Sequence, residues 1–153
     1  MLSSIPQRGF SQSEFEQRAQ KAQRIMNEEK LDAILLTTEP NVRYFSGFLT
    51  QFWQSPTRPW FLIVPREGEL IAVIPEIGRA GMESTWVNDI RTWASPCPED
   101  DGINLLAQAI SEVAMHFGRI GMTLGQESYL RIPANNFKQM SEIISPTEIV
   151  DVA

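Results

Sequence analysis

The segment at residues 50–60 (TQFWQSPTRPW) combines three aromatic residues with an arginine, the types that bind an amphipathic small ligand. An aromatic ring can cover the apolar part of such a ligand, while the arginine fork pairs with a carboxylate. The two prolines reduce the entropy that a loop loses on binding. Phe52, Trp53, Arg58 and Trp60 are therefore candidate substrate-gating residues. The alternative is an irregular connection whose aromatic rings close the edge of the core, and both interpretations stay open.

No set of residues in the sequence has the composition of a catalytic centre. A two-metal site needs several convergent carboxylates, usually with histidine, and His116 is the single histidine. Glu112 and His116 are spaced to share one face of a predicted helix, but two ligands on a solvated face do not make a catalytic site. A nucleophilic Cys97 would need a histidine base within reach, and nothing in the sequence places His116 beside it. We expect no catalytic residue and no metal site in this chain.

The sequence does not indicate phosphate or nucleic-acid binding. Gly118, Gly121 and Gly125 match neither the Walker pattern nor the dinucleotide fingerprint, and a helix end followed by a turn after a strand accounts for them. The chain has 19 acidic and 13 basic residues and a formal net charge of −6. Its basic residues are scattered, whereas nucleic-acid phosphates are bound by clustered Lys and Arg. We therefore expect no nucleic-acid partner.

Length and composition indicate one globular domain over residues 1–153. Hydrophobic residues make up 42% of the chain, within the range of globular proteins. The N-terminus lacks the apolar core of a signal peptide, and no apolar run approaches the roughly 20 residues that cross a bilayer. Cys97 is the single cysteine, which excludes an internal disulfide and is compatible with a reducing compartment. We expect a cytoplasmic protein without a membrane partner.

Hydrophobic periodicity predicts alternating helices and strands. The first helix carries a capping-box pattern at Ser11 and Glu14, and Gly118 suits the end of the fourth. The predicted helices span residues 11–29, 41–45, 76–85, 103–117 and 133–142, and the predicted strands span residues 31–37, 60–65, 70–74, 89–93, 119–123 and 149–152. The second and third strands form an antiparallel hairpin with a four-residue connection. The alternation predicts an α/β fold with helices packed on a mixed sheet.

Four segments resemble the N-terminal domain of the creatinase/prolidase family, and they occur in the family's order. Residues 31–48 (LDAILLTTEPNVRYFSGF) look like the family's opening strand and its Asn-x-Arg-Tyr-x-Ser/Thr-Gly-Phe signature. The others are residues 58–75 (RPWFLIVPREGELIAVIP), 88–93 (NDIRTW) and 118–125 (GRIGMTLG). Each segment alone is a weak signal, but four in order at compatible spacings are a strong one.

The resemblance implies a three-layer α/β/α domain with a mixed sheet in a ribonuclease-H-like layout. In that family this domain precedes a catalytic pita-bread domain, which we expect after residue 153 and which this chain lacks. There, two divalent metal ions (Mn, Co or Zn) are held by two Asp, one His and two Glu, and a bridging hydroxide attacks an amide carbon. The resemblance thus implies the non-catalytic domain of a metal-dependent Xaa-Pro dipeptidase or aminopeptidase.

The resemblance also bears on oligomeric state and on individual residues. In the family's dimers the N-terminal domain of one subunit reaches toward the other subunit's catalytic pocket, which implies a homodimer that gates access for small peptide substrates. Arg58 lies where creatine hydrolases carry an arginine that meets the substrate carboxylate, although its neighbours differ from that subfamily. Within the signature, we expect Asn41 to cap a turn, Tyr44 to pack, and Gly47 to adopt a conformation that other residues resist.

Two alternatives remain open and a third is rejected. The same domain could belong to a family member with other chemistry, such as creatine-type amidine hydrolysis or a lyase reaction. The chain could also be a free-standing α/β binding module. A nuclease would need a cluster of acidic metal ligands on strands and a basic face. Asp32 and Asp89 are the only acidic residues at predicted strand starts, and the sequence shows no basic face, so we reject a nuclease.

Overall fold

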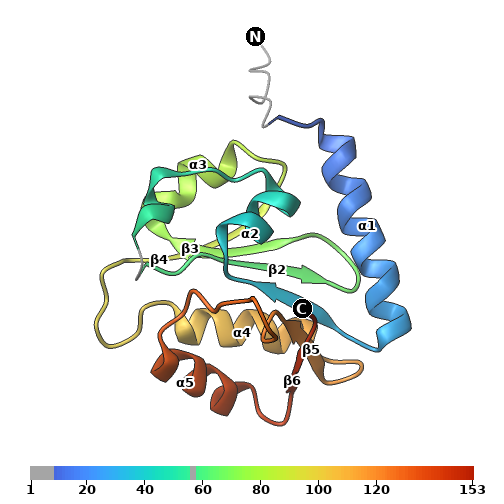
Figure 1. The fold of residues 1–153 in the computed structure, drawn as a ribbon. Coiled ribbons are helices and arrows are strands. Elements are labelled where there is room, and N and C mark those ends of the chain that lie inside the picture. The colour runs from blue at the N-terminus through green and yellow to red at the C-terminus, as the bar shows by residue number, and fades with distance from the viewer. Residues whose placement is uncertain (1–8, 56–57) are drawn as a thin grey trace.

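The computed structural model describes residues 9–55 and 58–153. In this part of the chain, six strands form one mixed sheet in the order β4-β3-β2-β1-β5-β6 (Figure 1). The strand β2 (Phe61–Pro65) runs antiparallel to all the others, which are β1 (Ala33–Leu36), β3 (Ile71–Pro75), β4 (Asp89–Trp93), β5 (Arg119–Met122) and β6 (Glu148–Asp151). The predicted hairpin is confirmed, because β2 pairs with β3 in antiparallel register.

Helices cover both faces of the sheet, as Figure 1 shows. One face carries α1 (Gln12–Glu29), α2 (Glu39–Ser46) and α3 (Arg79–Glu83), and the other carries α4 (Ile103–Val113) and α5 (Ala134–Ile144). Two short 3-10 helices, η1 (Gln51–Gln54) and η2 (Glu76–Gly78), flank β2 and β3. No helix in the described residues is long and apolar enough to cross a membrane.

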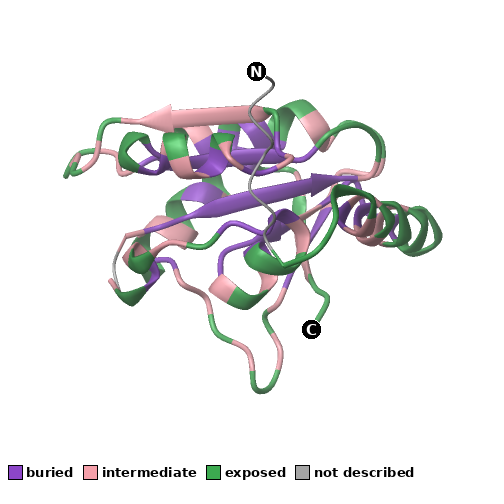
Figure 2. Cartoon of the chain, turned by 90° about the horizontal axis from the view of Figure 1, so that it is seen from above, coloured by how far each residue is buried: buried purple, intermediate pink, exposed green. Residues whose placement is uncertain are grey.

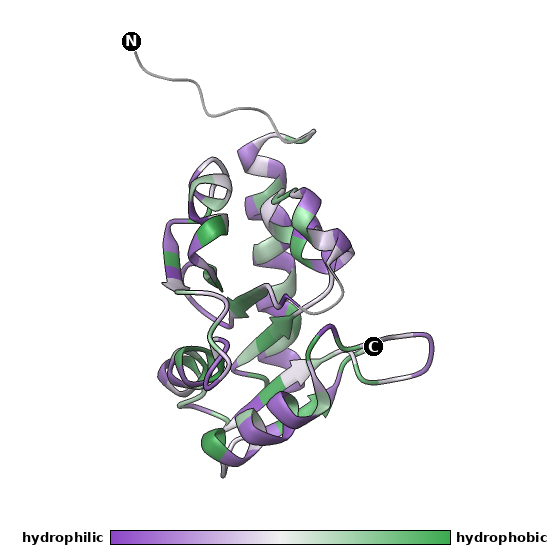
Figure 3. Cartoon of the chain, turned by 90° about the vertical axis from the view of Figure 1, so that its left-hand side faces the viewer, coloured by the Kyte–Doolittle hydropathy of each residue, from purple (hydrophilic) through white to green (hydrophobic). Residues whose placement is uncertain are grey.

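The sheet separates two hydrophobic cores, because side chains alternate between the faces of a strand. Phe61 and Ile63 of β2 pack with α4 and α5, whereas Leu62 and Val64 pack with α1, α2 and α3. All of β2 is buried, as a central strand covered on both faces requires. Figure 2 shows the burial concentrated in the central strands, and Figure 3 shows the hydrophobic strands between the helical layers. The predicted α/β class, three layers and mixed sheet are confirmed.

The helix α2 is longer than the single turn predicted at residues 41–45. It begins at Glu39 because Pro40 falls in the first turn, where the missing N–H group is one that the helix leaves unpaired anyway. Asn41 therefore lies inside the helix and does not cap it. Gly47 ends the helix at φ 74°, as expected for a residue that must adopt a left-handed conformation. Tyr44 does not pack into the core, since 50% of it is exposed.

The helix predicted to reach Phe117 ends earlier, at Val113, and Gly118 does not cap it. The backbone N–H groups of His116, Phe117 and Gly118 instead donate to Oδ2 of Asp32, at 3.2, 2.8 and 2.7 Å. A carboxylate that accepts several N–H groups competes with the helical hydrogen-bond pattern. The chain therefore leaves the helix at this point and turns into β5.

Candidate functional site

The predicted gating segment lies at the edge of the sheet where the parallel strands end. The strand β1 ends at this edge, and β2, which is antiparallel to it, begins there. The loop at residues 123–133 starts at the same edge, because it follows β5, the parallel neighbour of β1. Ligands of open α/β sheets bind in the crevice outside the carboxyl ends of the strands. Pro56 and Thr57, in the middle of the segment, lie outside the described residues.

The aromatic residues of the segment form one cluster with Phe48. The ring centroid of Trp60 lies 5.5 Å from that of Phe48, 6.0 Å from that of Trp53 and 6.2 Å from that of Phe52. These separations are typical of attractive aromatic pairs. Trp60 is 0% exposed and Trp53 is 7% exposed, so both rings belong to the core of the domain.

Close packing against Gly78 fixes the position of the Trp60 ring. A Cβ atom on Gly78 would lie only 2.2 Å from Cζ3 of Trp60, so the packing requires glycine in η2. At the other end of the segment, the hydroxyl of Thr50 accepts a hydrogen bond from the N–H group of Phe52 at 3.3 Å and caps η1. Tertiary packing and a local cap thus fix the two ends of the segment.

Core packing alone does not account for the two buried indole N–H groups. Nε1 of Trp53 and Nε1 of Trp60 have no hydrogen-bond partner among the described residues. A buried donor without an acceptor costs about 1–3 kcal/mol, and such groups are uncommon in native proteins. The cluster therefore contains two buried N–H donors to which no described residue supplies an acceptor.

Of the four candidate gating residues, Phe52 and Arg58 are half-buried. The guanidinium carbon of Arg58 lies 5.7 Å from the centroid of the Phe52 ring, in the range of a cation–π contact. Within residues 9–55 and 58–153, the Arg58 side chain has no salt bridge or hydrogen bond. Its donors are therefore open to an anionic group from outside the described part of the domain.

Arg131, in the loop after β5, is a functional candidate that no sequence pattern singles out. Its guanidinium donates hydrogen bonds to the backbone carbonyl oxygens of Trp53 (3.4 Å), Ser55 and Arg58. The guanidinium carbon also lies 5.0 Å from the centroid of the Trp53 ring. Burial lowers the pKa of the Arg131 side chain from its ordinary value, yet an arginine remains protonated at physiological pH. These partners lie 73–78 residues away in the chain, so no local signal could have identified Arg131.

The other candidate residues do not come together. Because α4 ends before His116, Glu112 and His116 do not share a helix face as predicted. Glu112 instead forms a salt bridge with Arg91 at 2.7 Å, and Cys97 is a half-buried thiol. Across the described part of the chain, no three His, Cys, Asp or Glu side chains are grouped so that they could hold a metal ion. The resemblance implies two divalent metal ions in the catalytic domain and none in this chain, and we assign these residues no catalytic step.

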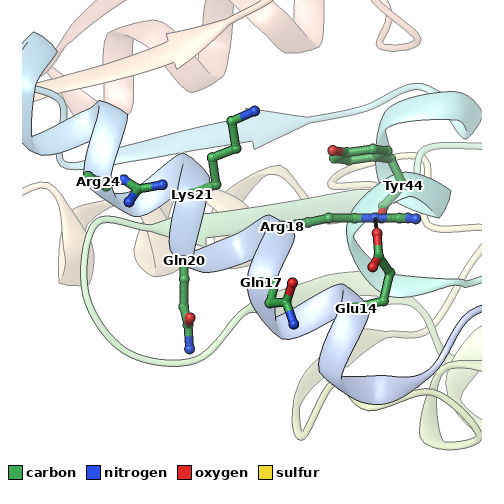
Figure 4. Close-up of a pocket in the computed structure, with 7 residues that line it drawn as sticks. All are labelled: Glu14, Gln17, Arg18, Gln20, Lys21, Arg24 and Tyr44. Carbon is green, nitrogen blue, oxygen red and sulfur yellow. Dashed lines mark hydrogen bonds and ion pairs between the residues drawn. The ribbon is translucent and has the colours of Figure 1, made fainter.

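A shallow hollow of about 490 Å³ lies along the exposed side of α1 (Figure 4). Arg18 reaches Oε1 of Glu14 at 3.2 Å, and its guanidinium carbon lies 4.5 Å from the centroid of the Tyr44 ring. In Figure 4 the side chains of Lys21 and Arg24 lie apart from this pair and do not converge on one point with it. The hollow is a solvated helix face, and we assign no ligand to it.

The family of the chain follows from a match to a family model. The model described as Creatinase/Prolidase N-terminal domain matches residues 18–153. The chain belongs to this family. No curated protein matches this creatinase/prolidase N-terminal domain in sequence.

Solved structures share the fold of this creatinase/prolidase N-terminal domain. The prolidase from Thermococcus sibiricus has a TM-score of 0.71 at 18% identity, over 90% of this chain and 34% of that chain. A proline dipeptidase from Streptococcus pneumoniae has a TM-score of 0.68 at 15% identity, over 88% of this chain and 90% of that chain. The Creatinase/Prolidase N-terminal domain of an X-Pro dipeptidase from Streptococcus pyogenes has a TM-score of 0.65 at 12% identity, over 89% and 93%. The chain thus spans about a third of the Thermococcus prolidase.

Proposed function

We propose that this domain is the non-catalytic N-terminal part of a metal-dependent Xaa-Pro dipeptidase or aminopeptidase. Membership of the family, and the prolidase and dipeptidase names of the structures with the same fold, support this class of enzyme. In this proposal the catalytic residues and the two divalent metal ions (Mn, Co or Zn) belong to a C-terminal catalytic domain. The enzyme works in the cytoplasm on small peptides.

The gating role proposed for the domain depends on Arg58. Its guanidinium lies over the ring of Phe52 and has no carboxylate partner in the described residues. An Xaa-Pro dipeptide presents a free carboxylate next to an apolar proline ring. The arginine fork suits the carboxylate, and the neighbouring aromatic ring suits the apolar ring. Arg58 and Phe52 would therefore contact the carboxyl-terminal end of the substrate.

Trp53 and Trp60 support this surface from the core. Trp60 stacks on Phe52 with an interplanar angle of 15°. Being fully buried, it would affect the substrate through the position of Phe52 rather than by contact. In the homodimer that we propose, the active site gated by Arg58 belongs to the partner subunit.

The test is the Mn²⁺-dependent hydrolysis of an Xaa-Pro dipeptide by the full-length protein. A hydrogen bond to a charged group contributes about 1.5–3 kcal/mol, so Arg58→Ala should raise KM by about 10- to 150-fold with a smaller change in kcat. Arg24, an exposed arginine on α1, provides the matched control, and Arg24→Ala should keep the wild-type KM. A wild-type KM in Arg58→Ala would contradict the proposed contact between Arg58 and the substrate. Creatine, assayed in parallel, tests the amidine-hydrolase alternative, because Arg58 would also fit its carboxylate.

A further inference from the structure

The segment that carries Arg58 is bound to a distant part of the chain by a single side chain. Arg131 lies between β5 and α5, and its guanidinium donates to the carbonyl oxygens of Trp53, Ser55 and Arg58. The carbonyl groups of Trp53 and Ser55 precede residues 56–57, which the structure does not describe, and the carbonyl group of Arg58 follows them. The guanidinium of Arg131 therefore binds the backbone on both sides of residues 56–57.

The geometry of a guanidinium explains why three carbonyl groups can meet at this point. Arginine presents five N–H donors in a rigid plane and accepts no hydrogen bond. These carbonyl groups lie outside the sheet, because β2 begins to pair with β3 at Phe61. The contact between the Arg131 guanidinium and the Trp53 ring, at 5.0 Å, also ties the cation to the aromatic cluster.

The partners of Arg131 indicate a role in shaping the loop rather than in balancing charge. Among the described residues Arg131 forms no salt bridge, and its hydrogen bonds all go to the backbone of the gating segment. By contrast, Arg119, at the opposite end of β5, donates to the carbonyl oxygens of Glu29 and Lys30 and also pairs with Glu148 at 3.3 Å.

We propose that Arg131 is a positioning residue, which fixes the backbone around Arg58 so that the Arg58 guanidinium is presented at the sheet edge. The loop-ordering role stands on the hydrogen bonds of Arg131 alone. Its consequence for substrate binding rests on the proposed function of Arg58. The two parts therefore need separate measurements.

Amide hydrogen exchange, followed by mass spectrometry, tests the loop-ordering role. Arg131→Ala should speed exchange of the amides of η1 at least about tenfold, because local opening becomes easier when the cation is lost. Arg131→Lys should lie between this variant and the wild type, since an ammonium group cannot replace the planar fork. Arg119→Ala is the matched control, because it also removes an arginine that binds backbone carbonyl groups but should leave η1 unchanged. Wild-type exchange of η1 in Arg131→Ala would overturn the proposal.

The Xaa-Pro assay of the full-length protein tests the consequence for the substrate. Arg131→Ala should raise KM in the same direction as Arg58→Ala, and Arg131→Lys should restore part of the loss. A raised KM in Arg58→Ala beside a wild-type KM in Arg131→Ala would overturn the substrate-positioning role. Faster exchange of η1 with a wild-type KM in both alanine variants would support the loop-ordering role and refute the proposed function of Arg58. The two failures are therefore distinguishable.

Discussion

Replacement of Asp32 is expected to destabilise the domain strongly. This carboxylate is 1% exposed and lies immediately before β1. Its Oδ2 accepts the N–H groups of His116, Phe117 and Gly118 at 3.2, 2.8 and 2.7 Å, and Nε of Arg66 lies 3.8 Å from Oδ1. One side chain thus joins the start of β1 to the segment that leads into β5 and to the residue that follows β2.

The expected loss follows from these contacts. Asp32→Ala removes the acceptor of three N–H groups and one of the two carboxylates that pair with Arg66, the other being that of Glu67. A hydrogen bond to a charged group contributes about 1.5–3 kcal/mol, and at the lower value the loss of two or three of them costs about 3–5 kcal/mol. At about 2–4 °C per kcal/mol for a domain of this size, the melting temperature should fall by about 6–20 °C. Asp32→Asn keeps one oxygen acceptor, so it should lose less than Asp32→Ala.

Thermal unfolding followed by circular dichroism measures this loss, and Asp89→Ala is the matched control. Asp89 also begins a strand, but it is partly exposed and pairs with Arg91 at 3.0 Å. Exposed salt bridges contribute about 0–1 kcal/mol, so the control should melt within a few degrees of the wild type. If Asp32→Ala melted no lower than Asp89→Ala, the carboxylate would not be needed to hold the three strands together.

Two further predictions concern packing and pH. Gly78→Ala should lower the free energy of unfolding by about 1–3 kcal/mol, because its Cβ would overlap the ring of Trp60; unchanged urea denaturation would contradict this packing. The N–H groups of Leu124 and Ala153 hold the pKa of Asp151 below its ordinary value. Its contribution to stability is therefore complete above the unfolded-state pKa, near 3.9, and is lost as the pH falls through the folded-state pKa. The difference in melting temperature between the wild type and Asp151→Asn should shrink below about pH 4, and a difference that grew on acidification would refute this assignment.

Most of the fold could be predicted because its signals are local. The strand predicted at residues 89–93 has the same bounds in the structure, and the hairpin follows from two apolar runs around a short turn. The end of α4 could not be predicted in this way. Val113 and Phe117 continue its apolar face, but Asp32, 84–86 residues earlier in the chain, accepts the N–H groups that would otherwise extend the helix.

The candidate site was predictable in composition but not in arrangement. The sequence shows that residues 50–60 combine aromatic rings with an arginine, yet it cannot show that Trp60 is fully buried while Arg58 remains half-exposed. This difference arises because the ring of Trp60 packs on Gly78, a contact that only the folded chain forms. Arg131 could not be predicted either, because its partners become its neighbours only when β1 and β5 pair in the folded chain.

The most direct test of the proposed function compares two proteins in one assay of Xaa-Pro dipeptide hydrolysis with added Mn²⁺. We expect the full-length protein to hydrolyse the dipeptide and the chain of residues 1–153 alone to leave it intact. Hydrolysis by the 153-residue chain alone would contradict a non-catalytic domain. A full-length protein that left Xaa-Pro dipeptides intact would contradict the peptidase assignment.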